Sequence, residues 1–207
     1  MPTSTADTIV DAALATLKEE GFAGASSRAI ARRGSFNQAL IFYHHGSVEG
    51  LLLEALDRTS EQRLARYREA LADVRTLEEL VLRAGELYEE DEASGHMRVV
   101  AQMVAGSVNR PELAREVLAR MDPWVAFAEE TLARVLPEGL PVPELAYALV
   151  TFYLGANLLT HLDPKDTRTG ALFRAGRELA PLAGLVPSAS AGSRGRPARS
   201  TGRASAR

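Results

Sequence analysis

The sequence predicts an all-α protein in which an N-terminal three-helix unit with a helix-turn-helix pattern precedes a larger C-terminal helical domain. Three observations lead to this prediction. Apolar residues recur every three or four positions along most of the chain. Serine, threonine or asparagine precedes several of these runs, where each can cap a helix N-terminus. Glycines and prolines separate the runs. The length of 207 residues, with 46% hydrophobic and 25% charged side chains, suits one or two globular domains.

The first helix is expected over residues 5–20. Its apolar residues Ile9, Ala13 and Leu17 recur every four positions and would form one inward face. Gly21 follows and is expected to end the helix, because glycine readily adopts the left-handed conformation of a C-terminal cap.

Two much shorter helices are expected next. Ser26 can cap the segment SRAIARR, which Gly34 and Ser35 would break. Asn37 can cap the segment QALIFYHH, which would end at Gly46. Two short helices joined by a tight turn, after a packing helix, form a helix-turn-helix pattern, which presents its second short helix to the DNA major groove.

The third helix has a distinct outward arc. At 100° per residue, Ile41 and His45 point to the opposite side from an arc that holds an amide and two aromatic rings. The residues on that arc are Gln38, Ala39, Phe42 and Tyr43.

The rest of the chain is predicted to be helical, with a linker at residues 137–143 and an interruption near Asp122 and Pro123, since proline removes an internal hydrogen bond. We expect the acidic run 89–92 to face solvent. The expected helices cover residues 48–71, 75–94, 96–108, 111–136, 142–162 and 167–186. The expected domains are a helix-turn-helix DNA-binding domain at 1–47, a helical ligand-binding and dimerisation domain at 48–187, and a disordered tail at 188–207.

Charge is unevenly distributed along the chain. Residues 188–207 carry five arginines and no acid, so removing this tail from the net charge of −3 leaves −8 on the remainder. The tail has nothing apolar to bury; it could add non-specific attraction to nucleic acid or serve solubility alone. Between Gly21 and Val48, however, there are three arginines, two histidines and no carboxylate, which is a local basic patch.

Several functional classes find no support in the sequence. The absence of cysteine excludes disulfides, thiolate nucleophiles and cysteine-ligated zinc. No glycine-rich phosphate loop, nucleophile elbow or metal-ligand spacing is present, so we expect no enzyme activity, no metal and no cofactor. His44 and His45 point about 100° apart on one helix and cannot easily share a metal ion. No signal peptide and no membrane-spanning run are recognised, so a cytoplasmic location is expected.

Residues 5–55 resemble the DNA-binding domain of the tetracycline-repressor (TetR) family of transcriptional regulators. The matching segments are IVDAALATLKEEGF, SSRAIARR and NQALIFYHHGSVEGLL, in the same order and without gaps. Three departures stand out: His45 replaces an aromatic that usually packs inside the domain, Val48 stands where a phosphate-contacting lysine is common, and residues 34–36 replace an alanine-glycine-aliphatic turn.

The resemblance implies which residues meet DNA. Arg28, in the first turn after Ser26, together with Tyr43 and His44, would contact the phosphate backbone, while Gln38 could read a base edge. The alternative for each of these residues is that it has no DNA contact and is an ordinary surface side chain, either solvated or packed against its neighbours. The full set of expected DNA contacts is Ser26, Ser27, Arg28, Asn37, Gln38, Ala39, Phe42, Tyr43 and His44.

The helices beyond residue 72 suggest a pocket and a partner. Mostly apolar side chains with a few polar groups could line a small-molecule site, although the same residues could be ordinary core. These candidates are Tyr88, Met97, Met103, Met121, Trp124, Phe127, Tyr153, Asn157 and His161. The last two helices are apolar on more than one face, and in the family such helices pair between subunits. The expected dimer contacts are Leu149, Phe152, Gly155, Ala156 and Leu159.

The resulting expectation is a homodimeric DNA-binding transcriptional regulator, a repressor released from a pseudo-palindromic double-stranded DNA operator by an unidentified small-molecule inducer. The alternative is an all-helical dimeric ligand-binding or scaffold protein that has lost sequence-specific DNA binding.

Overall fold

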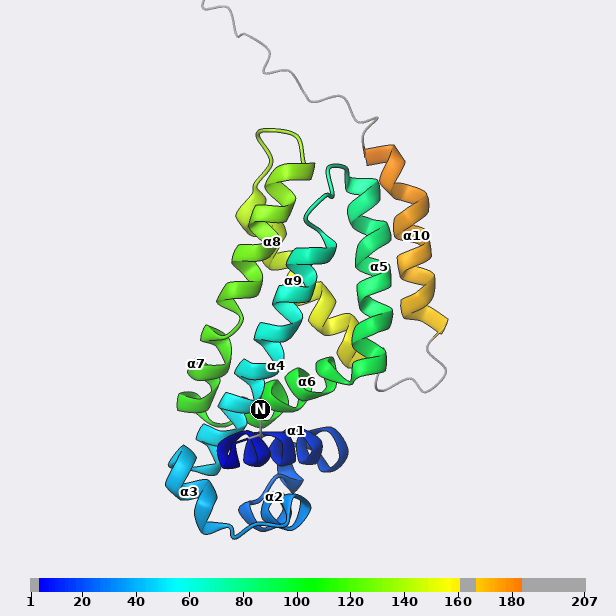
Figure 1. The fold of residues 1–207 in the computed structure, drawn as a ribbon. Coiled ribbons are helices and arrows are strands. Elements are labelled where there is room, and N and C mark those ends of the chain that lie inside the picture. Colours follow the sequence, from blue (N-terminus) through cyan, green and yellow to red (C-terminus); the bar gives the residue numbers. More distant parts are fainter. Residues whose placement is uncertain (1–3, 161–166, 184–207) are drawn as a thin grey trace, which may run out of the picture.

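The computed structural model describes residues 4–160 and 167–183, and these ranges contain ten α-helices and no strand (Figure 1). The expected tail at 188–207 lies outside them. The helices are α1 (Thr5–Gly24), α2 (Ser27–Gly34), α3 (Ala39–His45), α4 (Val48–Ala70), α5 (Leu77–Ser94), α6 (His96–Ser107), α7 (Pro111–Ala119), α8 (Asp122–Val135), α9 (Val142–Thr160) and α10 (Thr167–Ala183).

The helices form a small unit and a larger bundle that share one long helix. In Figure 1, α1, α2 and α3 lie together at one end of the molecule, and α4 runs from α3 into the bundle. There α8 packs along α9 and α10 packs along α5. Helix α6 lies across the junction and contacts α1, α4 and α9, so it touches both parts of the molecule.

Most of the expected helix ends are confirmed at the level of hydrogen bonds. The Ser26 hydroxyl accepts from the Ala29 N–H at the start of α2, and the Ser47 hydroxyl accepts from the Gly50 N–H at the start of α4. Gly21 has a positive φ of 71° and breaks the regular helix inside α1, as expected. The break between α7 and α8 falls directly before Asp122.

The turn between α2 and α3 differs from the expectation in detail. The helical conformation includes Gly34, and Ser35 takes the left-handed conformation instead, with φ 56°. Gly34 is required for a different reason: a Cβ there would lie 2.2 Å from the Phe36 ring, which packs over it. Helix α3 begins at Ala39 rather than Gln38, while the Asn37 side-chain oxygen still accepts from the Ala39 N–H at 2.9 Å.

Two clusters of buried apolar side chains hold the structure together. The first joins α1, α2 and α3 to the first half of α4 and to α6 and α7. The second joins the later part of α4 to α5, α8 and α9. Because α4 and α9 contribute side chains to both clusters, a displacement of residues in one cluster shifts the packing of the other.

Helix α9 combines a buried stripe with a wide exposed apolar face. Tyr147, Phe152, Leu158 and Leu159 are all exposed, whereas Ala146 and Asn157 are buried. By length and composition alone, α9 would be long enough to cross a membrane, so the expectation that no segment approaches this length was too strict. Its packing against α6 and α8 makes it part of the helical bundle.

Ile41 is the buried residue through which α3 is anchored, with none of its surface exposed. Replacing Ile41 by alanine is expected to lower the free energy of unfolding by about 2–5 kcal/mol, because the truncation leaves a cavity in the first core. Urea unfolding followed by circular dichroism would measure it. Leu118→Ala, at an exposed position on α7, is the control and should change stability by less than about 0.5 kcal/mol. Equal stability of both variants would contradict the anchoring role.

Candidate functional site

The surface formed by α2 and α3 exposes nearly every side chain expected to meet DNA. Of the expected DNA contacts, only Ser27 is half-buried. The exposed ones are Ser26, Arg28, Asn37, Gln38, Ala39, Phe42, Tyr43 and His44. Among the large hydrophobic side chains of the described residues, Tyr43 is the most open, at 82% exposure. Ile41 lies on the opposite, buried side, as the helical spacing predicts. The face therefore presents an amide, two aromatic rings and two potentially cationic groups.

Local contacts determine which of these side chains remain available to a ligand. Ser26 and Asn37 use their side-chain oxygens to cap helices. The Ser27 hydroxyl lies 3.4 Å from the Gln38 amide oxygen, which links α2 to α3. Arg28 makes no ion pair with a residue in the described ranges, whereas Arg33 is paired with Glu19 and Glu20 at 2.8 and 3.1 Å. Arg28 is thus the better candidate for a phosphate contact.

His45 fastens α3 to α4. Its side chain is 2% exposed, and Nδ1 lies 2.6 Å from the Glu54 carboxylate on α4. An ionised carboxylate only accepts hydrogen bonds, so Nδ1 carries the proton and donates it. This polar contact occupies the place where the family usually has a packed aromatic.

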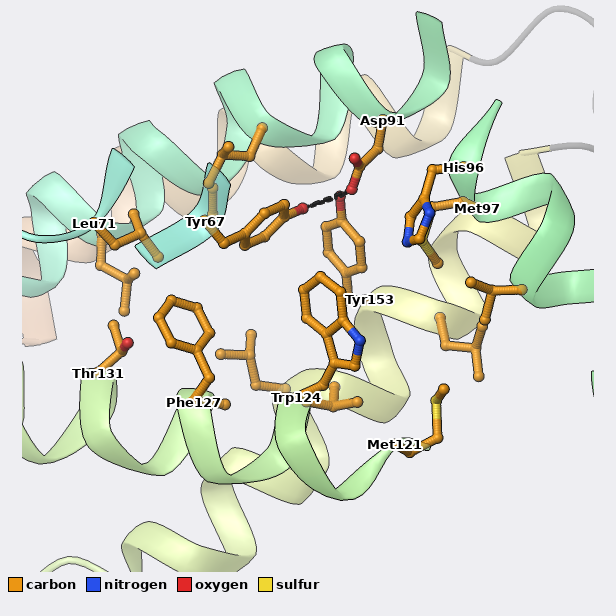
Figure 2. Close-up of a pocket in the computed structure, with 18 residues that line it drawn as sticks. Tyr67, Leu71, Asp91, His96, Met97, Met121, Trp124, Phe127, Thr131 and Tyr153 are labelled. Atoms are coloured by element: carbon orange, nitrogen blue, oxygen red, sulfur yellow. Dashed lines mark hydrogen bonds between the residues drawn. The ribbon is translucent and has the colours of Figure 1, made fainter. Parts of the chain in front are cut away.

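A second feature is a cavity of about 120 Å³ between helices of the larger bundle (Figure 2). Its walls come from the end of α4 and from α5, α6, α8 and α9. Most of the side chains that line it are apolar. Trp124 and Phe127 project from α8, and Tyr67 and Tyr153 face them from α4 and α9. The Tyr67 ring meets Trp124 edge to face at 5.3 Å and Phe127 at 6.4 Å between ring centroids.

The polar side of the cavity is built around Asp91 on α5, which is only 1% exposed. The hydroxyls of Tyr67 and Tyr153 each donate to its Oδ2 at 2.7 Å, and the two hydroxyl oxygens lie 2.7 Å apart (Figure 2). Its other oxygen, Oδ1, forms an ion pair with Arg63 of α4. The prediction that residues 89–92 all face solvent was therefore wrong at Asp91, because the partners of a buried carboxylate compensate its desolvation.

The cavity also sets the protonation state of its titratable groups. Burial, with the nearby Asp91 charge second, raises the pKa of Tyr67 far above its ordinary value, and burial likewise raises the pKa of Tyr153. Both phenols therefore remain protonated donors. Burial lowers the pKa of His96 to about 4, so its ring is neutral at pH 7. Its Nδ1 lies 2.9 Å from the Thr59 hydroxyl on α4.

Five of the nine expected ligand residues line this cavity: Met97, Met121, Trp124, Phe127 and Tyr153. The others do not. Met103 is fully buried in the first core, Tyr88 lies behind Tyr153 with its hydroxyl 2.7 Å from that of Thr160, and Asn157 donates to the Tyr153 carbonyl at 2.8 Å. His161 lies outside the described residues.

The sequence reasoning missed four polar wall residues, namely Tyr67, Asp91, His96 and Thr131. For Asp91 a signal existed. The cavity-facing residues of α5 are Leu80, Ala84, Leu87 and Asp91, which are three or four positions apart. A carboxylate that shares a helix face with buried apolar residues should be expected to be buried too when a cation and hydroxyl groups can reach it. His96 and Thr131 carry no comparable signal.

The expected dimer residues divide between two sides of α9. Phe152 and Leu159 are 46% and 65% exposed. Gly155 is half-buried, and a Cβ there would meet nothing within 4 Å. Ala156, in contrast, is buried within the chain, and Leu149 is partly exposed but also lines the cavity.

Comparisons with known proteins agree with this geometry. Residues 9–55 match the family model described as bacterial regulatory proteins, tetR family. The chain is 24% identical to the HTH-type transcriptional regulator UidR of Escherichia coli K12 over 171 residues, which is 81% of this chain and 86% of that protein.

Solved structures of similar fold cover most of the chain. FadR from Bacillus subtilis, a transcriptional regulator solved with stearoyl-CoA, superposes with a TM-score of 0.70 at 16% identity, covering 85% of this chain and 97% of that one. The multidrug binding protein EbrR, solved with imidazole, has a TM-score of 0.64 at 26% identity, covering 87% and 94%. The exposed α2–α3 face and the match over residues 9–55 identify a DNA-binding domain of the tetR family type, in a chain that is similar to transcriptional regulators along most of its length.

Proposed function

We propose that this regulator is a homodimeric repressor that reads a pseudo-palindromic operator through α3 and releases it when a small molecule fills the cavity. The observation that carries the proposal is that α4 and α6 both line an apolar cavity and both pack toward an exposed acid-free face on α2 and α3, α4 by contacting α3 directly and α6 by contacting α1. UidR is a transcriptional regulator, and FadR and EbrR were solved with small molecules, which supports the same division of labour here. The regulator would act in the cytoplasm, where bacterial DNA lies.

On DNA, different side chains would recognise the base sequence and contact the phosphate backbone. Gln38 lies at the N-terminal end of α3, and its amide can both donate and accept, as the edge of an adenine requires. Tyr43, His44 and Arg28 offer single hydrogen bonds or a charge, which suit phosphate oxygens. The alternative of a scaffold that has lost DNA binding is not favoured, because this face is intact.

The route from cavity to DNA runs along α6. Met97 lines the cavity and is also buried in the first core beside α1. Further along α6, the Gln102 side-chain oxygen accepts from the Phe22 N–H of α1 at 2.9 Å. Just before α6, the Lys18 ammonium of α1 donates to the carbonyl of Ser94, the last residue of α5, at 2.9 Å. A ligand that binds better to a shifted position of α6 would move α1, and α2 and α3 with it.

Dimerisation would use the exposed apolar face of α9. Phe152 and Leu159 lie on it, and the open space at Gly155 leaves room for a partner helix to approach closely. A two-fold dimer brings two copies of α3 to one duplex, so the operator is expected to be pseudo-palindromic, with half-sites about one helical turn or a multiple of it apart.

Gln38→Ala is expected to cost about 1–3 kcal/mol per half-site on the preferred operator and to relax base preference at one position. Tyr43→Phe should weaken binding to all duplexes about equally, because a phosphate contact carries no sequence information. Competition binding against single-base variants of an operator selected from a random duplex pool measures both effects. Gln62→Ala, at an exposed glutamine on α4 outside the α2–α3 face, is the control. The reverse pattern would show that α3 enters the groove in a different rotation.

Gly155→Arg is expected to convert the dimer to a monomer and to abolish specific DNA binding. The substitution fits the single chain, since nothing lies within 4 Å of its Cβ, but it places a charge on the apolar face. Light scattering at micromolar concentration gives the mass. Leu118→Arg, on exposed α7, should remain dimeric. A monomeric wild type would refute the proposed assembly.

His96 should make the fold sensitive to acid. Its pKa is about 4 in the folded chain and ordinarily about 6.5, so between these values only the unfolded chain takes up the proton and stability falls as the pH falls. From pH 7.5 to 4.5 this group alone should cost about 2–3 kcal/mol. Comparing urea midpoints of wild type and His96→Asn across this range isolates the contribution, and identical pH profiles would argue against a neutral buried imidazole.

A further inference from the structure

On the polar side of the cavity, the cluster of Tyr67, Tyr153 and Asp91 has acceptors to offer but no free proton. Each tyrosine hydroxyl has one proton and two lone pairs, and both protons are drawn into the cluster of Tyr67, Tyr153 and Asp91. The raised pKa of each phenol keeps these protons in place. What remains at the phenol oxygens is accepting capacity. A molecule that enters the cavity must therefore bring its own donor to make a hydrogen bond there.

The cavity is also balanced in charge. Asp91 is the one acidic side chain among the described wall residues, and Arg63 already pairs with it from behind. His96, the other titratable group apart from the phenols, is neutral because of its lowered pKa. An anion would find no unpaired cation in this wall. A cation would compete with the guanidinium of Arg63 for a carboxylate that two hydroxyls also occupy, and desolvating it would be costly.

The remaining walls select for apolar bodies of limited size. Trp124 and Phe127 of α8 stand opposite the tyrosines, and Met97 and Met121 supply adaptable thioether surface (Figure 2). Across the cavity from Asp91, the Thr131 hydroxyl is buried without a hydrogen-bond partner within the described part of the chain.

From this arrangement we infer that the effector is an uncharged, compact, mainly apolar molecule with a hydroxyl or N–H group, which donates to the paired oxygens of Tyr67 and Tyr153. Simple substituted phenols and indole-like molecules belong to this class. The inference rests on the proposed function only in that the cavity is the effector site. It names the chemistry of that site, and it excludes carboxylates, phosphates and quaternary ammonium ions as preferred ligands.

Four matched probes test it on the full-length chain at pH 7.5. They are 4-propylphenol, its methyl ether 4-propylanisole, 4-propylbenzoate and 4-propyl-N,N,N-trimethylanilinium, which share one apolar body and differ in donor and charge. Affinities come from isothermal titration calorimetry. Binding at this cavity is read from the fluorescence of Trp124, the chain's single tryptophan.

The phenol is expected to bind about threefold or more tightly than the ether, the net effect of one hydrogen bond. The benzoate and the anilinium are each expected to bind at least about tenfold more weakly than the phenol, because their charges would be buried uncompensated. An ether equal to the phenol, a charged probe that binds most tightly, or no binding that changes Trp124 fluorescence would each overturn the inference.

Asp91→Asn supplies a test by reversal. The variant keeps the shape of the side chain but removes the carboxylate that pairs most closely with Arg63, whose other partner, Glu90, lies 3.9 Å away. The cluster beside the cavity then carries one more positive charge, so the benzoate should gain affinity relative to the phenol by about tenfold or more. Glu89→Gln, at an exposed position of the same helix, is the matched control and should preserve the wild-type ranking. A folded Asp91→Asn variant with the wild-type ranking contradicts the charge argument. Should that variant fail to fold, the wild-type ranking decides alone.

A final arm separates this inference from the proposed function. The phenol is added to the complex of wild-type protein with its selected operator. Release of DNA supports both the inferred ligand class and the proposed ligand-induced release. If the phenol ranks first yet the complex persists, the ligand class stands and ligand-induced release falls; if another class of compound releases DNA while the phenol does not bind, the ligand class falls and release stands.

Discussion

The buried ion pair between Asp91 and Arg63 is the constraint on which the arrangement of the larger bundle depends. A carboxylate with 1% exposure is tolerable only while its partners remain in place. These partners come from two other helices: Arg63 and Tyr67 from α4, and Tyr153 from α9. The cluster therefore fixes the spacing of α4, α5 and α9 at one level, and the cavity opens beside it. Apolar packing alone would tolerate more variation in that spacing.

The same cluster explains why the cavity is polar on one side only. Tyr67 presents its ring to Trp124 and Phe127 while its hydroxyl turns toward Asp91. Tyr153 also lines the cavity, from α9, and donates to Asp91, while Tyr88 packs edge to face against its ring. Each tyrosine thus serves the apolar wall and the polar cluster at once. Their two roles make the cavity wall rigid at the point where a ligand's orientation would be decided.

Much of the fold was predictable from the sequence because its signals are local. Caps at Ser26 and Ser47 and the break at Gly21 depend on neighbouring backbone groups, and all were found as expected. The helical spacing of 100° per residue predicted the outward arc of Gln38, Ala39, Phe42 and Tyr43, and the exposure of these residues confirms it. The cavity was harder, since it depends on which helices meet. Asp91 was assigned to solvent because its partners, Arg63 and Tyr153, are distant in sequence. Met103 was assigned to the pocket because an inward methionine looks the same in either core.

Helix α9 has two working faces, and Leu149 contributes to both. Tyr153 and Leu154 face the cavity, while Phe152 and Leu159 lie on the exposed face proposed to meet a second copy. In such a dimer, the free energies of ligand binding and of subunit association are linked by mass action, because both depend on the position of the same helix. Ligand affinity would then vary with protein concentration, differing between dilute chains and fully associated ones. A cell that makes few copies of this regulator and a cell that makes many would respond to different levels of the same signal.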